Sequence, residues 1–287
     1  VTAGALTVTG SGATTFAGAI GSTKSLASLT VDGGGTALFN GGAVTTTGAQ
    51  TYADAVTLGA NTTLVTTNSS VGFTSTSTLN SSEALATAGT PAPATLSITA
   101  GSGDVTFGGI VGGAAYSATA TNGALGAVTL VSAKDVGINA AFTAASLTQQ
   151  AGTGTTTIGG ATTLTGVLSF TGSALTVNAA VTTGDAVGVV NTGNFTTSAS
   201  GDINVTGAFT QSGTGANNLS GDIATTGNIS FLSAVELTGN IAATAVGTNS
   251  TISFADTINS STTVARNLTL SAGKDILLSG ALGGTNK

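Results

Sequence analysis

The sequence predicts an all-β chain built as a parallel β-solenoid (β-helix), in which short strands stack coil upon coil. Three observations predict this fold. Short apolar runs alternate with polar residues, turn-forming Gly, Asn, Ser and Asp separate these runs, and a small strand, turn, strand module recurs along the chain. Alternation with a period of two puts apolar side chains on one face of a strand, so each run can bury one face.

The recurring module is clearest at residues 268–282, which read LTLSAGKDILLSGAL. Two alternating apolar runs flank a turn of small residues, and similar copies lie at 128–142 and 195–209. In each copy, and in a fourth turn upstream, an aspartate directly precedes an alternating run: Asp104, Asp135, Asp202 and Asp275. Such repetition is typical of architectures in which each unit buries its apolar face only against its neighbours.

Composition supports strands. The chain of 287 residues has 44 Gly, two Pro, 40% hydrophobic and only 6% charged residues, whereas about a quarter of an ordinary domain is charged. Abundant Thr, Val and Ile favour strands, and disordered chains are usually richer in charge and Pro. No segment has helical apolar periodicity, and no run of 18 apolar residues is present.

Charge and residue usage exclude several functions. A net charge of −6 with five cationic residues argues against nucleic acid and against anionic membrane surfaces, because both are bound through Lys and Arg. The lack of Cys excludes disulfides but does not exclude export. The lack of Met, with no signal peptide at the start, leads us to expect a processed product or an interior segment.

The first part of the chain shows closely spaced apolar pairs separated by turn signals. The candidates for its buried face are Leu6, Val8, Phe16, Leu29, Val31, Leu38, Val44, Tyr52, Val56, Leu58 and Leu64. Residues 74–95 interrupt the pattern with Glu83, Pro91 and Pro93, and proline cannot donate to a strand ladder. We expect a loop excursion there, with a linker between subdomains as the alternative.

The pattern resumes after a second irregular stretch at 112–126 and continues to the module at 268–282. We therefore predict one continuous solenoid over residues 1–287. Coils of roughly 20 to 25 residues would give about a dozen turns. The alternative fold is an antiparallel β-sandwich array, because repeated hairpins have a similar local pattern.

Residues 26–64, with SLTVDGGGTALFNGGAVTTTGAQTYADAVTLGANTTL inside them, resemble repeats of large bacterial surface exoproteins. These are similar to filamentous haemagglutinin and to autotransporter passenger regions, and the AGKDI and SGDI turns resemble the same group. The resemblance implies a right-handed parallel β-helix, secretion to the cell surface, and an adhesive or structural role. The family's secretion-signalling N-terminal domain is absent from this sequence, which would make the chain an interior portion.

Catalysis has few candidate groups. Without His or Cys, only carboxylates, Lys and Ser/Thr remain, and glycan hydrolysis needs two carboxylates about 5 to 9 Å apart. The aspartates of the four turns are separated by 31, 67 and 73 residues, so we expect them to lie apart and to form turns through Asx hydrogen bonds, with Lys274 solvated. We predict no enzyme and no catalytic residue.

Two further patterns are candidate binding sites. The DGGGT stretch at Asp32 is a solitary, imperfect match to calcium-binding β-roll repeats, so we predict no metal or cofactor. The runs Thr45–Thr47 and Thr155–Thr157 suggest a flat hydroxyl face for glycan contact, O-glycosylation or ice binding. The simpler interpretation is that Thr is a favoured solvent-facing strand residue.

These observations predict a non-enzymatic, extracellular structural or adhesive solenoid, a segment or subunit of a cell-surface fibre. Its expected partner is itself, through head-to-tail stacking or continuation of the solenoid, because an uncapped solenoid end exposes unpaired strands. Surface glycans or other cells are further candidate partners. The alternative function is a protein that binds or cleaves glycans along one face.

Overall fold

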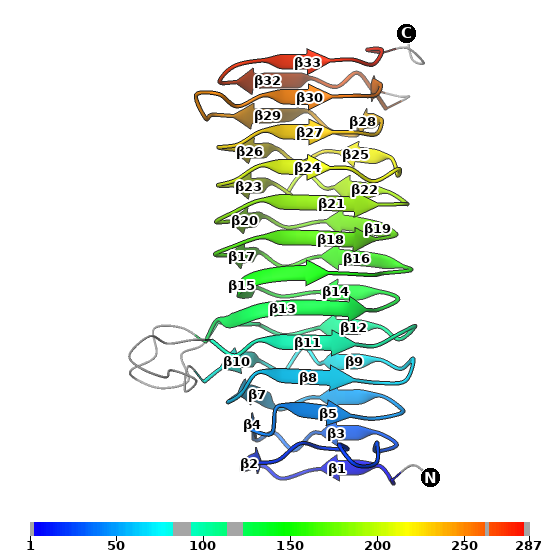
Figure 1. The fold of residues 1–287 in the computed structure, drawn as a ribbon, viewed down its shortest axis with the longest axis vertical. Coiled ribbons are helices and arrows are strands. Elements are labelled where there is room, and N and C mark those ends of the chain that lie inside the picture. The colour runs from blue at the N-terminus through cyan, green and yellow to red at the C-terminus, as the bar shows by residue number, and fades with distance from the viewer. Residues whose placement is uncertain (1–2, 83–92, 114–122, 262–263, 284–287) are drawn as a thin grey trace. The chain divides into compact units, whose positions relative to one another are not determined.

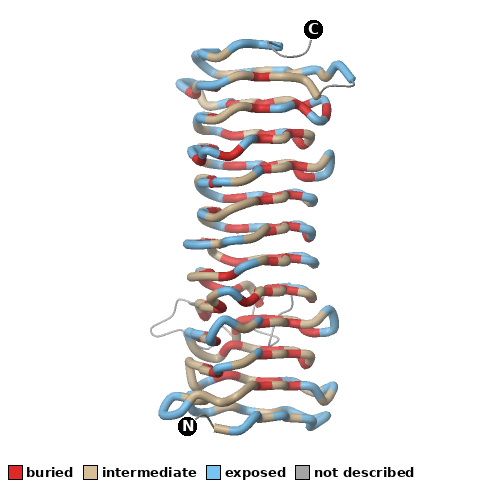
Figure 2. Tube along the Cα trace, turned by 90° about the vertical axis from the view of Figure 1, so that its right-hand side faces the viewer, coloured by how far each residue is buried: buried red, intermediate tan, exposed pale blue. Residues whose placement is uncertain are grey.

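The computed structural model describes residues 3–82, 93–113, 123–261 and 264–283 of the chain. The regular elements in these ranges are β-strands with parallel pairings (Figure 1). Buried and more exposed residues alternate along the strands (Figure 2). No described residue is helical, and accordingly no described helix could cross a membrane. The predicted parallel β-solenoid is confirmed, and the antiparallel sandwich alternative is wrong.

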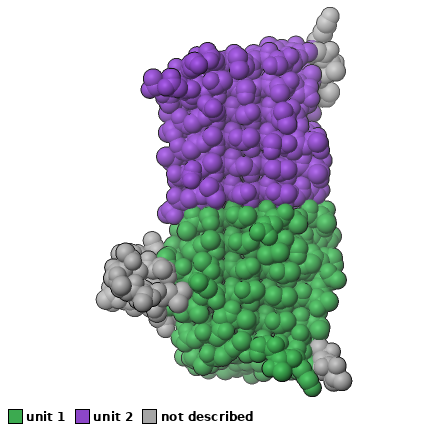
Figure 3. All heavy atoms as spheres, in the orientation of Figure 1, with its two compact units in different colours: residues 1–153 green, residues 154–287 purple. Residues whose placement is uncertain are grey.

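The chain divides into two compact units, residues 1–153 and 154–287 (Figure 3). In each unit the chain winds through three stacks of strands, which we call the first, second and third faces. Six strands occupy the first face of each unit, so the described residues form six coils per unit. The expectation of about a dozen coils is confirmed.

Unit 1 has strands of three to eight residues. Its first face contains β1 (Leu6–Val8), β3 (Leu29–Val31), β6 (Gln50–Tyr52), β9 (Val71–Phe73), β12 (Val105–Phe107) and β14 (Val136–Ile138). Its second face contains β2 (Ala13–Phe16), β4 (Thr36–Phe39), β7 (Ala55–Leu58) and β10 (Leu79–Ser81). Its third face contains β5 (Ala43–Thr45), β8 (Thr62–Val65), β11 (Leu96–Thr99), β13 (Leu125–Ser132) and β15 (Phe142–Gln149).

Unit 2 repeats the three faces regularly. Its first face contains β16 (Thr155–Ile158), β19 (Ala174–Val177), β22 (Phe195–Thr197), β25 (Asn217–Leu219), β28 (Val235–Leu237) and β31 (Ile258–Ser260). Its second face contains β17 (Thr162–Leu164), β20 (Val181–Thr183), β23 (Ile203–Val205), β26 (Ile223–Thr225), β29 (Ile241–Ala245) and β32 (Leu268–Ala272). Its third face contains β18 (Leu168–Gly172), β21 (Val187–Asn191), β24 (Phe209–Gln211), β27 (Ile229–Phe231), β30 (Ile252–Phe254) and β33 (Ile276–Leu278).

Two coils of unit 1 are longer than the others. Val71 pairs with Val105 and Val105 with Val136, which are steps of 34 and 31 residues, whereas the step from Gln50 to Val71 is 21. The extra residues fall in the stretches predicted to be irregular. Residues 79–81 form β10, so the coil continues into the predicted excursion at 74–95. The centre of that excursion, with Glu83 and Pro91, lies outside the described residues.

The core is a stack of inward side chains from successive coils. In unit 1 the rings of Phe73 and Phe107 lie 5.6 Å apart, and in unit 2 the rings of Phe231 and Phe254 lie 5.2 Å apart, both pairs stacked. One predicted core residue is misplaced: Leu38 points outward, between buried Ala37 and Phe39. Alternation around Leu38 is ambiguous because Ala, Leu and Phe follow one another, and the largest ring takes the interior.

Buried side-chain amides near the coil corners form hydrogen bonds with other buried groups. In unit 1 the Tyr52 hydroxyl donates to Gln50 Oε1 at 2.9 Å, and Gln50 Nε2 donates to the carbonyl of Val65 at 2.9 Å. In unit 2 Gln211 Nε2 donates to Asn191 Oδ1 at 2.9 Å. Burial raises the pKa of the Tyr52 phenol well above its usual value. These polar groups remain inside because each has a hydrogen-bond partner.

The last coil of unit 2 is the exception to burial. Strand β33 pairs with β30, and its inward positions Ile276 and Leu278 follow Ile252 and Phe254 in register. They are nevertheless 44% and 40% exposed, because no described residue covers them. The module that shows the repeat most clearly in the sequence is therefore the one that the described residues leave uncovered.

Candidate functional site

The four predicted turn aspartates lie at coil corners, but not at the same corner. Asp104 and Asp135 precede strands of the first face, β12 and β14. Asp202 precedes β23 of a second face, and Asp275 precedes β33 of a third face. The recurring module is therefore a corner that the chain uses at the entry to strands of all three faces. It is not the repeating coil itself.

Two of the four aspartates, Asp104 and Asp202, bond to the following coil rather than within their own turn. Asp104 Oδ1 accepts from the backbone N–H of Asp135 at 3.3 Å, and Asp202 Oδ1 accepts from that of Asp222 at 2.9 Å. The prediction that sequence separation keeps these groups apart is wrong for Asp104 and Asp135. Their 31 residues form one complete coil, which brings the two corners into register. Local Asx bonding is likewise the wrong explanation for Asp104 and Asp202.

Asparagines at other corners make the same bond. Asn61 Oδ1 accepts from the N–H of Thr95 at 3.0 Å. Asn228 Oδ1 accepts from Thr251 at 2.9 Å, and Asn240 Oδ1 from Asn267 at 2.9 Å. Because a neutral amide oxygen serves as well as a carboxylate oxygen, the bond requires an acceptor and not a charge. This interchange favours a structural role for the corner aspartates.

Each of the two corner lysines pairs with the adjacent aspartate. Lys134 Nζ lies 2.7 Å from Asp135 Oδ2, and Lys274 Nζ lies 3.5 Å from Asp275 Oδ2. The hydrogen bond and the charge of Asp135, with a smaller contribution from Asp104, raise the pKa of Lys134. Both ammonium groups are exposed, as was expected for Lys274, so solvent screens these pairs.

The glycine turn after Asp32 binds a carboxylate, and the residue responsible was missed in the sequence. Asp54 is only 3% exposed, and its Oδ1 accepts from the N–H groups of Gly33 and Gly34 at 2.9 and 2.8 Å. Gly34 has a φ of 73°, a conformation that favours glycine. The turn therefore presents donors to an anionic side chain, whereas calcium would need oxygen ligands. Within the described ranges no group of three or more His, Cys, Asp or Glu side chains is arranged to hold a metal ion.

The two threonine runs do not form flat hydroxyl faces. The middle residue of each run, Thr46 or Thr156, is buried, as the alternation of a strand requires. Thr46 Oγ1 donates to the carbonyl of Gly48 at 2.6 Å. Outward polar residues align instead between coils, and Thr163, Thr182 and Asn204 are successive register partners on the second face of unit 2.

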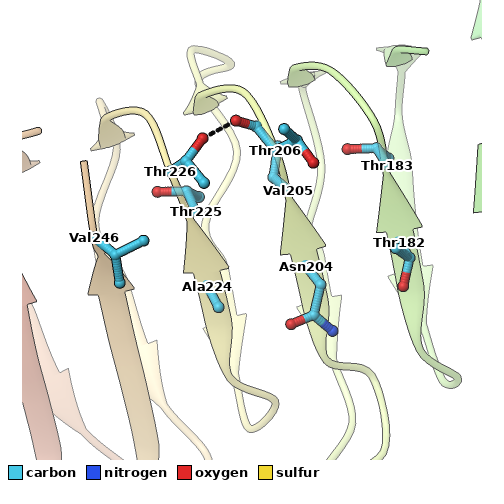
Figure 4. Close-up of a pocket in the computed structure, with 9 residues that line it drawn as sticks. All are labelled: Thr182, Thr183, Asn204, Val205, Thr206, Ala224, Thr225, Thr226 and Val246. Atoms are coloured by element: carbon cyan, nitrogen blue, oxygen red, sulfur yellow. Dashed lines mark hydrogen bonds between the residues drawn. The ribbon is translucent and has the colours of Figure 1, made fainter. Parts of the chain in front are cut away.

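A shallow groove of about 250 Å³ lies on this second face (Figure 4). It crosses β20, β23 and β26 and reaches the residue after β29. Its lining residues are all neutral: Thr182, Thr183, Asn204, Val205, Thr206, Ala224, Thr225, Thr226 and Val246. Ala224 follows Asn204 in register and precedes Thr244, so a methyl group stands between two longer side chains. The hollow follows from this short side chain.

Polar groups in the groove are available to a ligand. Thr226 Oγ1 donates to the carbonyl of Thr206, and the buried Thr225 donates to Gly227. The exposed side chains of Thr182, Asn204 and Thr206 have no hydrogen-bond partner among the described residues. The groove thus offers hydroxyl and amide groups beside the exposed Val246, but no acid, base or nucleophile pair.

Fold and surface together define a parallel β-solenoid repeat protein whose polar corner residues tie one coil to the next. Comparisons with protein-family models, with curated proteins and with solved structures each found no match.

Proposed function

We propose that this chain is a non-enzymatic structural or adhesive solenoid, a segment or subunit of an extracellular fibre. The observation that carries the proposal is the uncovered last coil of unit 2. Ile276 and Leu278 continue the inward column of Ile252 and Phe254, yet they are 44% and 40% exposed. Apolar side chains in this position are stabilised when a further coil covers them.

The covering coil comes from a second copy stacked head to tail, or from continuation of the same chain. Either arrangement extends the ladder of backbone hydrogen bonds, because a parallel strand presents free N–H and C=O groups at its outer edge. The corner design supports this role. The backbone N–H of Asp222 donates to Asp202 Oδ1 and that of Ala242 donates to Asp222 Oδ1, so these corner hydrogen bonds link three successive coils.

Self-association of the chain tests the stacking form of this proposal. Sedimentation and negative-stain microscopy over a range of protein concentrations should show end-to-end oligomers. Ile276→Asp combined with Leu278→Asp should abolish them by placing charge in the stacking surface. Leu277→Asp is the matched control, because Leu277 lies on the same strand, is 52% exposed and points outward.

Discrete monomers of the unmodified chain at all concentrations would overturn stacking between copies. Equal loss of association in the Leu277→Asp control would show that a charge anywhere on β33 prevents self-association. That result would also contradict a stacking surface formed by Ile276 and Leu278. Circular dichroism of each variant checks that the remaining coils stay folded.

A glycan-binding role is the second candidate, favoured by the neutral groove of unit 2.

A further inference from the structure

We infer that the groove on the second face of unit 2 binds a neutral sugar ring within a polysaccharide. The inference rests on the adhesive form of the proposed function and names its ligand class. Thr182, Asn204 and Thr206 supply exposed hydroxyl and amide groups that both donate and accept. Sugar hydroxyls have the same dual capacity, so they match this set better than a purely anionic or cationic ligand would.

The apolar part of the groove completes the match. Ala224 forms the hollow, and Val246 is 66% exposed at its border. A pyranose ring presents C–H groups on its faces and hydroxyls on its rim. The ring face can lie against Ala224 while the rim reaches Asn204 and Thr206, and burial of apolar surface favours this placement. Thr182 and Val246 lie one strand further out on either side, so they can contact the neighbouring sugar units of the polysaccharide.

Charge around the groove selects against acidic polymers. Asp202 and Asp222 come two residues before Asn204 and Ala224, and alternation places them on the same outward side of β23 and β26. Each carboxylate also accepts a backbone N–H of the next coil, which holds it beside the groove. Uronic acids and nucleic acids would meet like charge there, whereas a neutral glycan would not.

The size of the groove sets the expected affinity. Its volume of about 250 Å³ lies below the roughly 300 to 1,000 Å³ typical of pockets that enclose small molecules. We therefore expect one ring to bind in the millimolar range. Useful adhesion would come from many copies presented together, since linked weak sites gain strongly in avidity.

Titration of the isotope-labelled full chain with neutral oligosaccharides of hexoses tests the inference. Saturable NMR shifts should appear at the amides of Thr182, Asn204 and Ala224. Asn204→Ala should weaken binding about fivefold, as expected for one lost hydrogen bond. Ala224→Leu should weaken it by at least as much by filling the hollow. Ala13→Leu is the control, because Ala13 is an exposed strand residue of the other unit.

Three results would each overturn the inference. The first is no saturable shift with any neutral oligosaccharide up to tens of millimolar. The second is equal binding by the wild type and Ala224→Leu. The third is oligogalacturonate binding as tightly as the neutral sugars. End-to-end stacking is measured separately through Ile276 and Leu278, so failure of glycan binding is distinguishable from failure of the fibre proposal.

Discussion

Asp202 accepts, through Oδ1, a hydrogen bond of 2.9 Å from the backbone N–H of Asp222, which lies 20 residues further along the chain. A side-chain hydrogen bond thus joins one coil to the next, in addition to the backbone hydrogen bonds between their strands. Asp222 repeats the bond to Ala242 at 2.7 Å. The corner therefore adds to the cohesion between successive coils.

Asp202→Ala should destabilise unit 2 by about 1 kcal/mol, the usual net contribution of one hydrogen bond. Asp202→Asn should cost much less, because the amide retains Oδ1 as an acceptor, as at Asn228 and Asn240. Urea denaturation of both variants provides the measurement. Equal destabilisation by Asn and Ala would show that the charge matters and not the acceptor.

Asp54→Ala should destabilise unit 1 more strongly, by about 3 kcal/mol. It removes two hydrogen bonds, from the N–H groups of Gly33 and Gly34 to one carboxylate oxygen, and a hydrogen bond to a charged group contributes roughly 1.5 to 3 kcal/mol. Thermal unfolding followed by circular dichroism measures the change. Calcium or a chelator should leave the wild-type transition in place, and a large upward shift with calcium would contradict our assignment of this turn.

The buried tyrosine predicts a loss of stability at alkaline pH. Burial raises the pKa of Tyr52 in the folded state, so the unfolded chain, with a tyrosine pKa of about 10, releases this proton first. The contribution is fully present below pH about 10 and is lost as the pH rises above it. Tyr116→Phe leaves Tyr52 as the sole tyrosine. Its phenolate absorbance should then appear only together with unfolding.

Reversible ionisation of Tyr52 near pH 10 with an unchanged circular dichroism spectrum would contradict this prediction. Tyr52→Phe is the matched variant. It removes the titration but leaves Gln50 Oε1 without its donor, so we expect a loss of about 1 to 2 kcal/mol at neutral pH.

Phe231→Ala should destabilise unit 2 by about 3 to 5 kcal/mol. Phe231 is 1% exposed and its ring lies 5.2 Å from the rings of both Phe209 and Phe254, so its removal leaves a cavity that three coils share. Denaturant titration checks this, with Thr210→Ala as control. Thr210 is exposed on the neighbouring strand β24, and its truncation should change stability by less than about 0.5 kcal/mol.

Much of the fold was predictable from local pattern. Period-two alternation predicted strands such as β3, β14 and β27, and inward side chains there are buried. The pattern failed at Leu38, where three consecutive apolar residues allow either side to face the core. Burial of Ile276 and Leu278 was also expected from the pattern, but burial depends on a covering coil that alternation within one strand does not specify.

The candidate site was less predictable. A signal for Asp222 was present, because the tetrapeptide SGDI occurs at 200–203 and again at 220–223, one coil apart. The signal for Asp54 was weaker, because it consists only of an aspartate before the alternating run of β7. The groove had no local signal, since Thr182, Asn204 and Ala224 come from three different coils.

The sequence by itself determined that the chain forms short strands around an apolar core, because alternation and turn chemistry act within a few residues. Parallel pairing was the favoured prediction, but only the structure excluded the antiparallel alternative. Only the tertiary structure decided which corners meet, which carboxylate binds which backbone amide, and where a methyl group leaves a hollow. Those relationships depend on the length of each coil. A step of 20 residues aligns Asp202 with Asp222, and a step of 31 aligns Asp104 with Asp135.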